Sequence, residues 1–253
     1  MENRPEVLIE VAHLTCLLEG HLVLDDVSFQ VSRGEIFGVM GLSGAGKSTL
    51  LRNIMGLVRP QSGSILVNGV DITQLGEVAL NEVRLKMAMS FQYSALFDSL
   101  NVFDNVAFGL RRRRVPKPDV REKVAHYLEV VGMAGTEALM PANLSGGMRK
   151  RVSIARALST EPEVVLYDEP TSGLDPVLAA TIDHLIVKLR DDFGVSSIVV
   201  THDVEHLFGY ADRAMMLYQA KAVECGTPQA LRQSQNPVVR QFISGAVEGP
   251  IVV

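Results

Sequence analysis

The sequence predicts an α/β fold built around a largely parallel sheet. Short apolar runs rich in Val and Ile alternate with longer segments of helical character along most of the chain. Several of these runs are apolar almost throughout, as expected for strands that are covered on both faces. An antiparallel pair at the start of the chain and a helical insertion in its middle complete the expected architecture.

The boundaries of the expected elements follow from the same patterning. Residues 7–14 and 23–31, separated by Glu19-Gly20, alternate apolar and polar positions and predict the antiparallel pair. Further strands are expected at residues 35–40, 64–67, 87–90, 164–167, 197–200 and 214–217. Helices are expected at residues 47–56, 177–192 and 204–211, and such alternation of strands and helices favours a parallel sheet.

The 253 residues are expected to form one domain that contains an insertion. Residues 1–92 and 161–230 are assigned to the α/β core, and residues 231–253 to a C-terminal tail. Residues 93–160 show few strand signals and are interpreted as a helical subdomain between the two halves of the core.

Composition argues against several classes of function. Lys and Arg number 24 against 29 for Asp and Glu, a formal charge of -5, so no nucleic-acid partner is predicted. Cys16 and Cys225 lie far apart without metal-ligand spacing, which favours a reducing cytosol over a disulfide framework. No segment resembles a secretion signal or approaches the roughly 18 apolar residues of a membrane-spanning helix. If the protein acts at a membrane, another polypeptide is expected to span that membrane.

A glycine-rich segment predicts a phosphate-binding loop. The run Gly41-Leu42-Ser43-Gly44-Ala45-Gly46-Lys47-Ser48 fits G-x-x-x-x-G-K-[ST] and lies between an expected strand and an expected helix. Its glycines let backbone N–H groups point at phosphate oxygens, Lys47 adds positive charge, and the Ser48 hydroxyl can ligate Mg²⁺. The residues predicted to bind the nucleotide here are Gly41, Ser43, Gly44, Ala45, Gly46, Lys47, Ser48 and Thr49.

Two acids follow the apolar strand expected at residues 164–167. Because strands deliver their carboxyl ends to the edge where ligands bind in open α/β folds, Asp168 and Glu169 are expected beside the phosphate loop. Asp168 is predicted to hold Mg²⁺ through water. Glu169 is then the candidate to orient or deprotonate an attacking water.

Further motifs narrow the class of nucleotide-binding protein. Leu144-Ser145-Gly146-Gly147-Met148 resembles the LSGGQ signature of ABC ATPases. Gln92 matches the Q-loop glutamine, Ser172-Gly173-Leu174-Asp175 the D-loop and His202 the switch histidine, all in family order. The chain is therefore identified by resemblance as an ABC ATPase, which implies a P-loop NTPase fold with a RecA-like core, an antiparallel β-subdomain and an inserted helical subdomain.

The resemblance also implies roles for these residues. Gln92 would sense Mg²⁺ and the attacking water, and His202 would contact the γ-phosphate. Ser145, Gly146 and Gly147 would contact the nucleotide of a second subunit, with Asp175 at the dimer interface, so a homodimer that binds ATP and Mg²⁺ is implied.

Two departures from the family pattern concern the signature and the base. Met148 replaces the signature glutamine, and little loss of hydrolysis is expected because Ser145 and the glycines remain. Cys16 stands where relatives carry an aromatic residue that stacks on adenine. Loss of that stacking, worth ~0.5–1.5 kcal/mol, predicts only modest discrimination between bases.

The segments around residues 94–106, 145–151 and 237–250 resemble the ATPases of the Mla and Mce lipid-transport systems. The resemblance implies a homodimer at the cytoplasmic face of the bacterial inner membrane. An integral-membrane permease would dock on the segment from Leu96 to Val106. An MCE-type substrate-binding protein and a small regulatory protein are further implied partners. An ATPase of an amino-acid-type importer and an iron–sulfur assembly subunit stay open as alternatives.

Two other segments are given interpretations. The basic run from Arg111 to Arg114 is interpreted as a solvated loop, with contact to anionic headgroups or to an acidic partner as the alternative. The tail after Ser244 is of low polarity, which favours docking, in relatives of the Mla type onto a second subunit, over free disorder.

Overall fold

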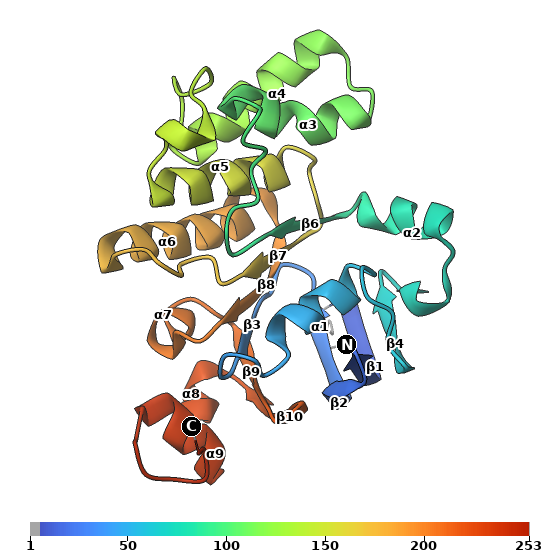
Figure 1. The fold of residues 1–253 in the computed structure, drawn as a ribbon, viewed down its shortest axis with the longest axis vertical. Coiled ribbons are helices and arrows are strands. Elements are labelled where there is room, and N and C mark those ends of the chain that lie inside the picture. The colour runs from blue at the N-terminus through green and yellow to red at the C-terminus, as the bar shows by residue number, and fades with distance from the viewer. Residues whose placement is uncertain (1–5, 253) are drawn as a thin grey trace, which may run out of the picture.

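The computed structural model describes residues 6–252 and contains two β-sheets and a group of helices (Figure 1). The smaller sheet and helix α1 lie on one side of the larger sheet, and helices α3 to α6 lie on the other. The predicted α/β architecture with an antiparallel opening is confirmed.

The smaller sheet is antiparallel and has the order β2-β1-β4-β5. Its strands are β1 (Val7–Leu18), β2 (His21–Ser32), β4 (Ser62–Val67) and β5 (Val70–Asp71). Strands β1 and β2 are joined by Glu19 and Gly20, whose φ angles of 50° and 83° are both positive. Two left-handed residues form the kind of hairpin turn whose twist matches that of the flanking strands.

One expected strand belongs to a different sheet from the one predicted. Residues 64–67 were grouped with the strands of the parallel core, but β4 pairs antiparallel with β1, with Ile9 opposite Val67. Only Ile65 and Val67 of β4 are buried, so the strand has one apolar face. Such alternation is typical of a half-buried antiparallel strand, whereas parallel core strands are apolar on both faces.

The larger sheet has the order β10-β9-β3-β8-β7-β6. Its strands are β3 (Ile36–Met40), β6 (Met87–Ser90), β7 (Val164–Asp168), β8 (Ser196–Thr201), β9 (Arg213–Tyr218) and β10 (Lys221–Gly226). All neighbouring pairs are parallel except β9 and β10. Strand β10 escaped prediction because its sequence, KAVECG, mixes polar and apolar residues at a partly exposed edge.

Strand β7 shows why the central strands carry apolar residues on both faces. Val165 and Tyr167 belong to the cluster beneath the helices, whereas Val164 and Leu166 belong to the cluster that includes the smaller sheet and α1. Successive side chains point to opposite faces, and because both faces of the sheet are covered, apolar residues are favoured on both.

The helices surround this framework (Figure 1). The α-helices are α1 (Lys47–Ile54), α2 (Glu77–Arg84), α3 (Val102–Arg112), α4 (Lys117–Val130), α5 (Gly146–Leu158), α6 (Pro176–Phe193), α7 (Val204–Phe208), α8 (Pro228–Arg232) and α9 (Pro237–Ser244). Two short 3-10 helices, η1 (Ile72–Gln74) and η2 (Pro141–Asn143), complete the set. None of the helices within residues 6–252 combines the length and apolar character needed to span a bilayer.

Residues 93–160, all of which the structure describes, contain only helices and loops. Val106 and Leu110 of α3 and Val124 of α4 are buried in the same apolar cluster as Tyr167 of β7. The helical segment therefore shares one continuous core with the larger sheet. Its position relative to the strands is set by that packing.

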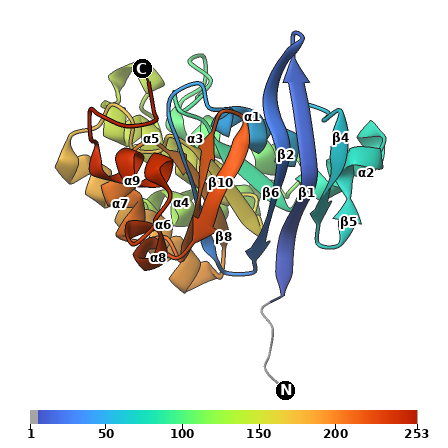
Figure 2. The same ribbon diagram turned by 90° about the horizontal axis from the view of Figure 1, so that it is seen from below.

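The C-terminal segment folds back on the chain itself (Figure 2). Gln241 of α9 is buried, and its side-chain oxygen accepts a 2.7 Å hydrogen bond from the backbone N–H of Ile251. Its amide nitrogen donates to the Ile251 carbonyl at 3.1 Å, and the Ile251 side chain is buried. The expected docking of this apolar tail thus occurs here on α9 of the same chain.

Candidate functional site

The site is formed where the parallel strands end. The predicted phosphate loop joins β3 to α1, and Gly46 stands immediately before the helix with φ of 100°. A Cβ atom there would lie 2.6 Å from the Val23 carbonyl oxygen, so both the backbone angle and the available space require glycine. The loop is thereby held against the β1–β2 hairpin, with its backbone beside the helix N-terminus.

Lys47 is almost completely buried within this loop. Its ammonium donates hydrogen bonds to the carbonyls of Gly41 and Leu42 at 2.8 and 2.9 Å and lies 3.7 Å from the Glu169 Oε1 atom. Burial lowers the pKa of Lys47, and the carboxylates of Glu169 and Asp168 oppose that shift. The side chain therefore places a cation where phosphate oxygens would lie.

Asp168, the last residue of β7, is paired with the first helix. Its Oδ1 atom accepts a 2.9 Å hydrogen bond from the Ser48 hydroxyl. Burial raises the pKa of Asp168, while the Ser48 hydrogen bond opposes the increase. A carboxylate and a hydroxyl at this distance are hard oxygen ligands of the kind that Mg²⁺ prefers, so the pair fits the predicted metal site.

Glu169 is held in a strained position between two basic side chains. Its Oε2 atom lies 2.9 Å from His202 Nδ1, and its φ of 49° is in the left-handed region. Such outliers in residues other than glycine persist where the surroundings over-determine them, and they concentrate at functional sites. The Glu169 side chain is 12% exposed, whereas that of His202 is 62% exposed.

These groups line one cavity of about 590 Å³. The lining brings together most of the residues that the sequence predicted, namely Ser43, Gly44, Gly46, Lys47, Ser48, Thr49, Gln92, Glu169 and His202. Gly41 and Ala45 of the same loop and Asp168 at the end of β7 do not line the cavity, but Asp168 is hydrogen-bonded to Ser48, which does. Leu18, Val23, Leu42 and Phe242 provide an apolar part of the wall.

Four further predicted residues lie outside both the phosphate loop and the cavity lining. Ser145 accepts a 3.2 Å hydrogen bond from the Met148 N–H and caps α5, while Gly146 and Gly147 form its first turn. Asp175 accepts hydrogen bonds from the backbone of Val177 and Leu178 and caps α6. Ser145, Gly146 and Asp175 are exposed, so the ends of α5 and α6 are open to another molecule.

The structure corrects the interpretation of Cys16 as a residue facing the base. Its side chain is completely buried in the apolar cluster beneath the smaller sheet, 3.5 Å from the amide nitrogen of Asn53. Leu18, two residues further along β1, lines the cavity instead. The pairing register of β1 is irregular around Cys16. Alternation alone therefore does not predict on which face of the sheet each side chain of this segment lies.

The basic run is exposed, as expected, but Arg111 and Arg112 form the last turn of α3 and not a loop. Arg111 forms an ion pair with Asp104 at 2.8 Å, and its guanidinium lies over the Phe103 ring. Arg113 donates hydrogen bonds to the carbonyls of Thr160 and Leu85. Arg113 therefore fastens the end of α3 to other parts of the chain, whereas both partners of Arg111 lie on α3 itself.

Sequence reasoning missed Lys150, which belongs to α5. Its side chain is buried, and its ammonium donates hydrogen bonds to the carbonyls of Gln92 and Glu169. A signal was present in the sequence. Lys150 lies three residues after Gly147 and four before Ile154, on the buried stripe of a helix, where a lysine needs polar partners.

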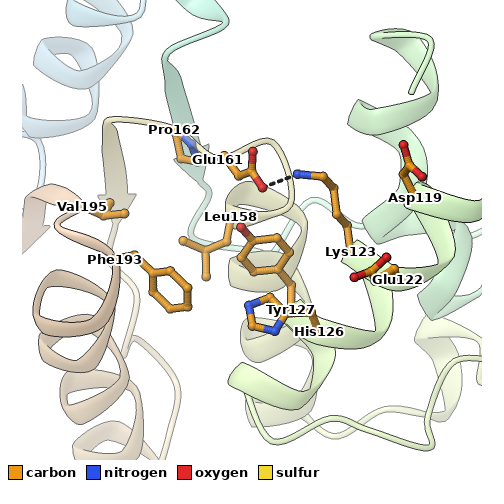
Figure 3. A pocket seen from close by; sticks show the side chains of 10 residues that line it. All are labelled: Asp119, Glu122, Lys123, His126, Tyr127, Leu158, Glu161, Pro162, Phe193 and Val195. Carbon is orange, nitrogen blue, oxygen red and sulfur yellow. Dashed lines mark hydrogen bonds and ion pairs between the residues drawn. The ribbon is translucent and has the colours of Figure 1, made fainter. Parts of the chain in front are cut away.

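A second cavity of about 620 Å³ lies at the opposite ends of the strands (Figure 3). It is bounded by α4, the end of α5 and the residues that precede β7 and β8. His126, Tyr127 and Phe193 line it, together with an ion pair between Lys123 and Glu161. Burial raises the pKa of Tyr127 to about 12, so its phenol stays neutral under physiological conditions.

The sequence is similar to ATP-binding subunits of known transporters. It is 42% identical to the intermembrane phospholipid transport system ATP-binding protein MlaF of Haemophilus influenzae, over 96% of this chain and 93% of that protein. The MlaF protein of Escherichia coli K12 is 40% identical over 99% of this chain and 94% of its own length. A probable ribonucleotide transport ATP-binding protein of Mycobacterium leprae is also 40% identical, over 97% of this chain and 71% of that protein.

Solved structures resemble the fold over nearly its full length. A subunit of the cbiONQ ABC transporter complex of Clostridium perfringens superposes with a TM-score of 0.85 at 28% identity, over 94% of this chain and 95% of that one. A dimeric ATP-binding cassette bound to ADP and Pi superposes with a TM-score of 0.80 at 27% identity, over 87% of this chain and 98% of that one. The model of the ABC transporter family matches residues 24–172, and the chain belongs to this family.

Proposed function

We propose that the chain hydrolyses ATP and drives a separate membrane permease. One observation carries the proposal: the buried Glu169 carboxylate lies between Lys47, at 3.7 Å, and His202, at 2.9 Å, beside the Ser48–Asp168 pair. A carboxylate, a cation and a magnesium site in one cavity are the groups that phosphoryl transfer to water needs.

The residues have distinct roles in this reaction. Lys47 and the loop N–H groups hold the phosphates, which leaves the γ-phosphorus facing Glu169 and His202. Glu169 accepts a proton from water as the water oxygen bonds to phosphorus and the bond to the ADP oxygen breaks. His202 orients the Glu169 carboxylate through Nδ1, which leaves Nε2 for contact with the γ-phosphate. Mg²⁺ held by Ser48 and Asp168, with Gln92 as a further ligand, would supply positive charge to the phosphates.

The active unit is a homodimer. Ser145 and Gly146 are exposed at the N-terminus of α5 but stay outside the cavity of their own chain. A helix N-terminus attracts phosphate, so these residues suit the nucleotide of a second copy, with Asp175 at the interface. The dimeric arrangement of a similar solved cassette supports this assignment. ATP then favours the closed dimer because it contacts both copies.

The decisive experiment compares Glu169→Gln with the wild type. The variant is expected to lose ATP turnover and to accumulate as a dimer when Mg·ATP is added, which size-exclusion chromatography would detect. Glu161→Gln is the matched control, because Glu161 is an exposed glutamate outside the cavity. Unimpaired turnover of Glu169→Gln would remove Glu169 as the base.

The permease is proposed to dock on the segment from Leu96 to Val106. Val102 and Val106 are completely buried and belong to the core of the chain, so they are not available for docking. Phe97 is 41% exposed, and its ring lies 4.6 Å from that of the exposed Phe108. The buried Asn105 bonds both the N–H and the carbonyl of Phe97 and holds it outward. An apolar side chain held at the surface suits a partner's helix.

Replacement of Phe97 tests this docking. Phe97→Ala is expected to weaken the stimulation of ATPase activity by the permease in reconstituted liposomes while leaving basal turnover intact. Phe193→Ala is the control, because Phe193 is 40% exposed but lies on the second cavity. Equal stimulation of ATPase activity by the permease in both variants would contradict the assignment of Phe97 to the docking surface.

Phospholipid is the proposed cargo, and the cytoplasmic face of the bacterial inner membrane is the proposed location. The MlaF relatives, which are named as phospholipid transport proteins, support this over nearly the whole chain. An MCE-type substrate-binding protein and a small regulatory protein complete the proposed assembly.

The cargo can be tested directly. The complex purified with its permease is expected to move fluorescent phospholipid between liposomes in an ATP-dependent manner. Uptake of labelled ribonucleotide in place of lipid would favour the role named for the mycobacterial relative. Amino-acid uptake would favour a small-solute importer.

A further inference from the structure

We propose that Lys150 is a positioning residue that fastens the signature helix α5 to the backbones of Gln92 and Glu169. The inference rests on the proposed ATP hydrolysis and adds a residue that acts through others. Three motifs that lie far apart in the sequence thereby meet at one ammonium group.

The Lys150 side chain forms a buried link, here called the tie, between α5 and the backbones of Gln92 and Glu169. Lys150 is 6% exposed, and its Nζ atom donates to the carbonyl oxygen of Gln92 and, at 3.1 Å, to that of Glu169. An ammonium taken out of water needs such acceptors, because an unpaired buried charge costs several kcal/mol. Burial lowers the pKa of Lys150, and the Glu169 and Asp168 carboxylates oppose that shift.

The two carbonyls lie just beyond the ends of β6 and β7. Gln92 follows β6 and Glu169 follows β7, and these neighbouring parallel strands are paired only as far as Ser90 and Tyr167. The N–H of Glu169 donates to the Val200 carbonyl at 2.9 Å, and its carbonyl accepts hydrogen bonds from the Ser172 N–H at 3.2 Å and from Lys150 at 3.1 Å. Both polar groups of this left-handed peptide segment are then fixed.

The tie also connects the catalytic loops to the part of the chain that meets a second copy. Lys150 lies on the second turn of α5, and exposed Ser145 caps the first. A helix is rigid over this distance, so a shift of its N-terminus carries the ammonium with it. Movement of the signature is therefore transmitted to Gln92 and to the Glu169 backbone within one subunit.

The first test is Lys150→Met, which keeps an unbranched side chain of nearly the same length but removes the donor. It is expected to lower kcat at least ~10-fold while KM for ATP changes less than ~3-fold, because Lys47 and the loop still bind the phosphates. Lys150→Arg, which can still donate to both carbonyls, is expected to recover most of kcat. The control is Lys123→Met, a lysine-to-methionine change on α4 that should leave kcat within ~2-fold of the wild type.

A second measurement does not depend on turnover. In hydrogen–deuterium exchange of the nucleotide-free protein, backbone amides in residues 91–95 and 169–172 should exchange faster in Lys150→Met than in Lys150→Arg or Lys123→Met. Unchanged kcat together with unchanged exchange would overturn the tie. Slower turnover with uniformly faster exchange across α5 would mean that Lys150 serves general folding instead. A wild type without ATPase activity would refute the proposed function, while the exchange data would still decide the inference.

Discussion

The two cavities at opposite ends of the larger sheet have nearly the same volume but different chemistry. The cavity at the carboxyl ends of the strands measures about 590 Å³ and contains Lys47 and Glu169, whose side chains are 7% and 12% exposed. The cavity at the other end measures about 620 Å³, and its ion pair joins Lys123 to Glu161, with side chains 32% and 60% exposed (Figure 3).

This difference in the burial of charge distinguishes a functional site from a hollow in the surface. Charges buried beside one another cost free energy that only partners or a ligand can offset, so their presence at the first cavity indicates a functional demand. The exposed pair at the second cavity gains little from its neighbour because water screens it. Burial and pairing of charge, and not volume, distinguish the two.

Replacement of Lys47 should have the largest effect, and it tests the difference between the two cavities most directly. Lys47→Ala removes the buried cation from the phosphates and leaves Glu169 without it, so kcat/KM for ATP should fall by ~10³-fold or more. Steady-state ATPase assays measure this change. Lys123→Ala in the second cavity should stay within ~2-fold of the wild type, and a comparable loss there would break the distinction.

Tyr127→Ala should separate stability from chemistry. Tyr127 is buried beside the second cavity, and its removal should lower the free energy of unfolding by ~3 kcal/mol through lost packing. Urea unfolding measures the loss. Turnover per folded molecule should be unchanged, whereas a fall in kcat would give the second cavity a catalytic connection.

The pair of His206 and Asp183 should show an effect of intermediate size, because its carboxylate is buried but its imidazole is partly exposed. The hydrogen bond to Asp183 raises the pKa of His206, so the protonated histidine stabilises the fold below about pH 6.5 and this stabilisation is lost as pH rises through the raised pKa. The Tm of wild type minus that of His206→Gln should therefore shrink between about pH 6 and 9. A difference that is constant or grows with pH would contradict this sign.

The ion pair in the second cavity should matter least. Glu161→Gln and Lys123→Met, singly or together, should change the free energy of unfolding by less than ~1 kcal/mol at physiological ionic strength. A double-mutant cycle in urea measures the coupling between them. Coupling well above ~1 kcal/mol that persists in high salt would show that this pair is less screened than its exposure indicates.

The sequence by itself determined the α/β class and the residues of the catalytic chemistry. The phosphate loop and the pair Asp168 and Glu169 could be recognised because each is a contiguous segment whose chemistry depends on local backbone geometry. His202 was identified through its place after an apolar strand in the order of the family's motifs. The structure brings these segments to one edge, as parallel strands require.

Only the tertiary structure decided which side chains meet across that edge. It assigned β4 to the antiparallel sheet, buried Cys16, and gave Lys150 two carbonyl partners from loops 58 and 19 residues away in the sequence. Alternation and spacing report the local preference of a segment, while such contacts depend on how separate segments pack. The free energy of burying a charge depends on hydrogen-bonding partners that are distant in the chain. For this reason the role of Lys150 could be recognised only in the folded protein.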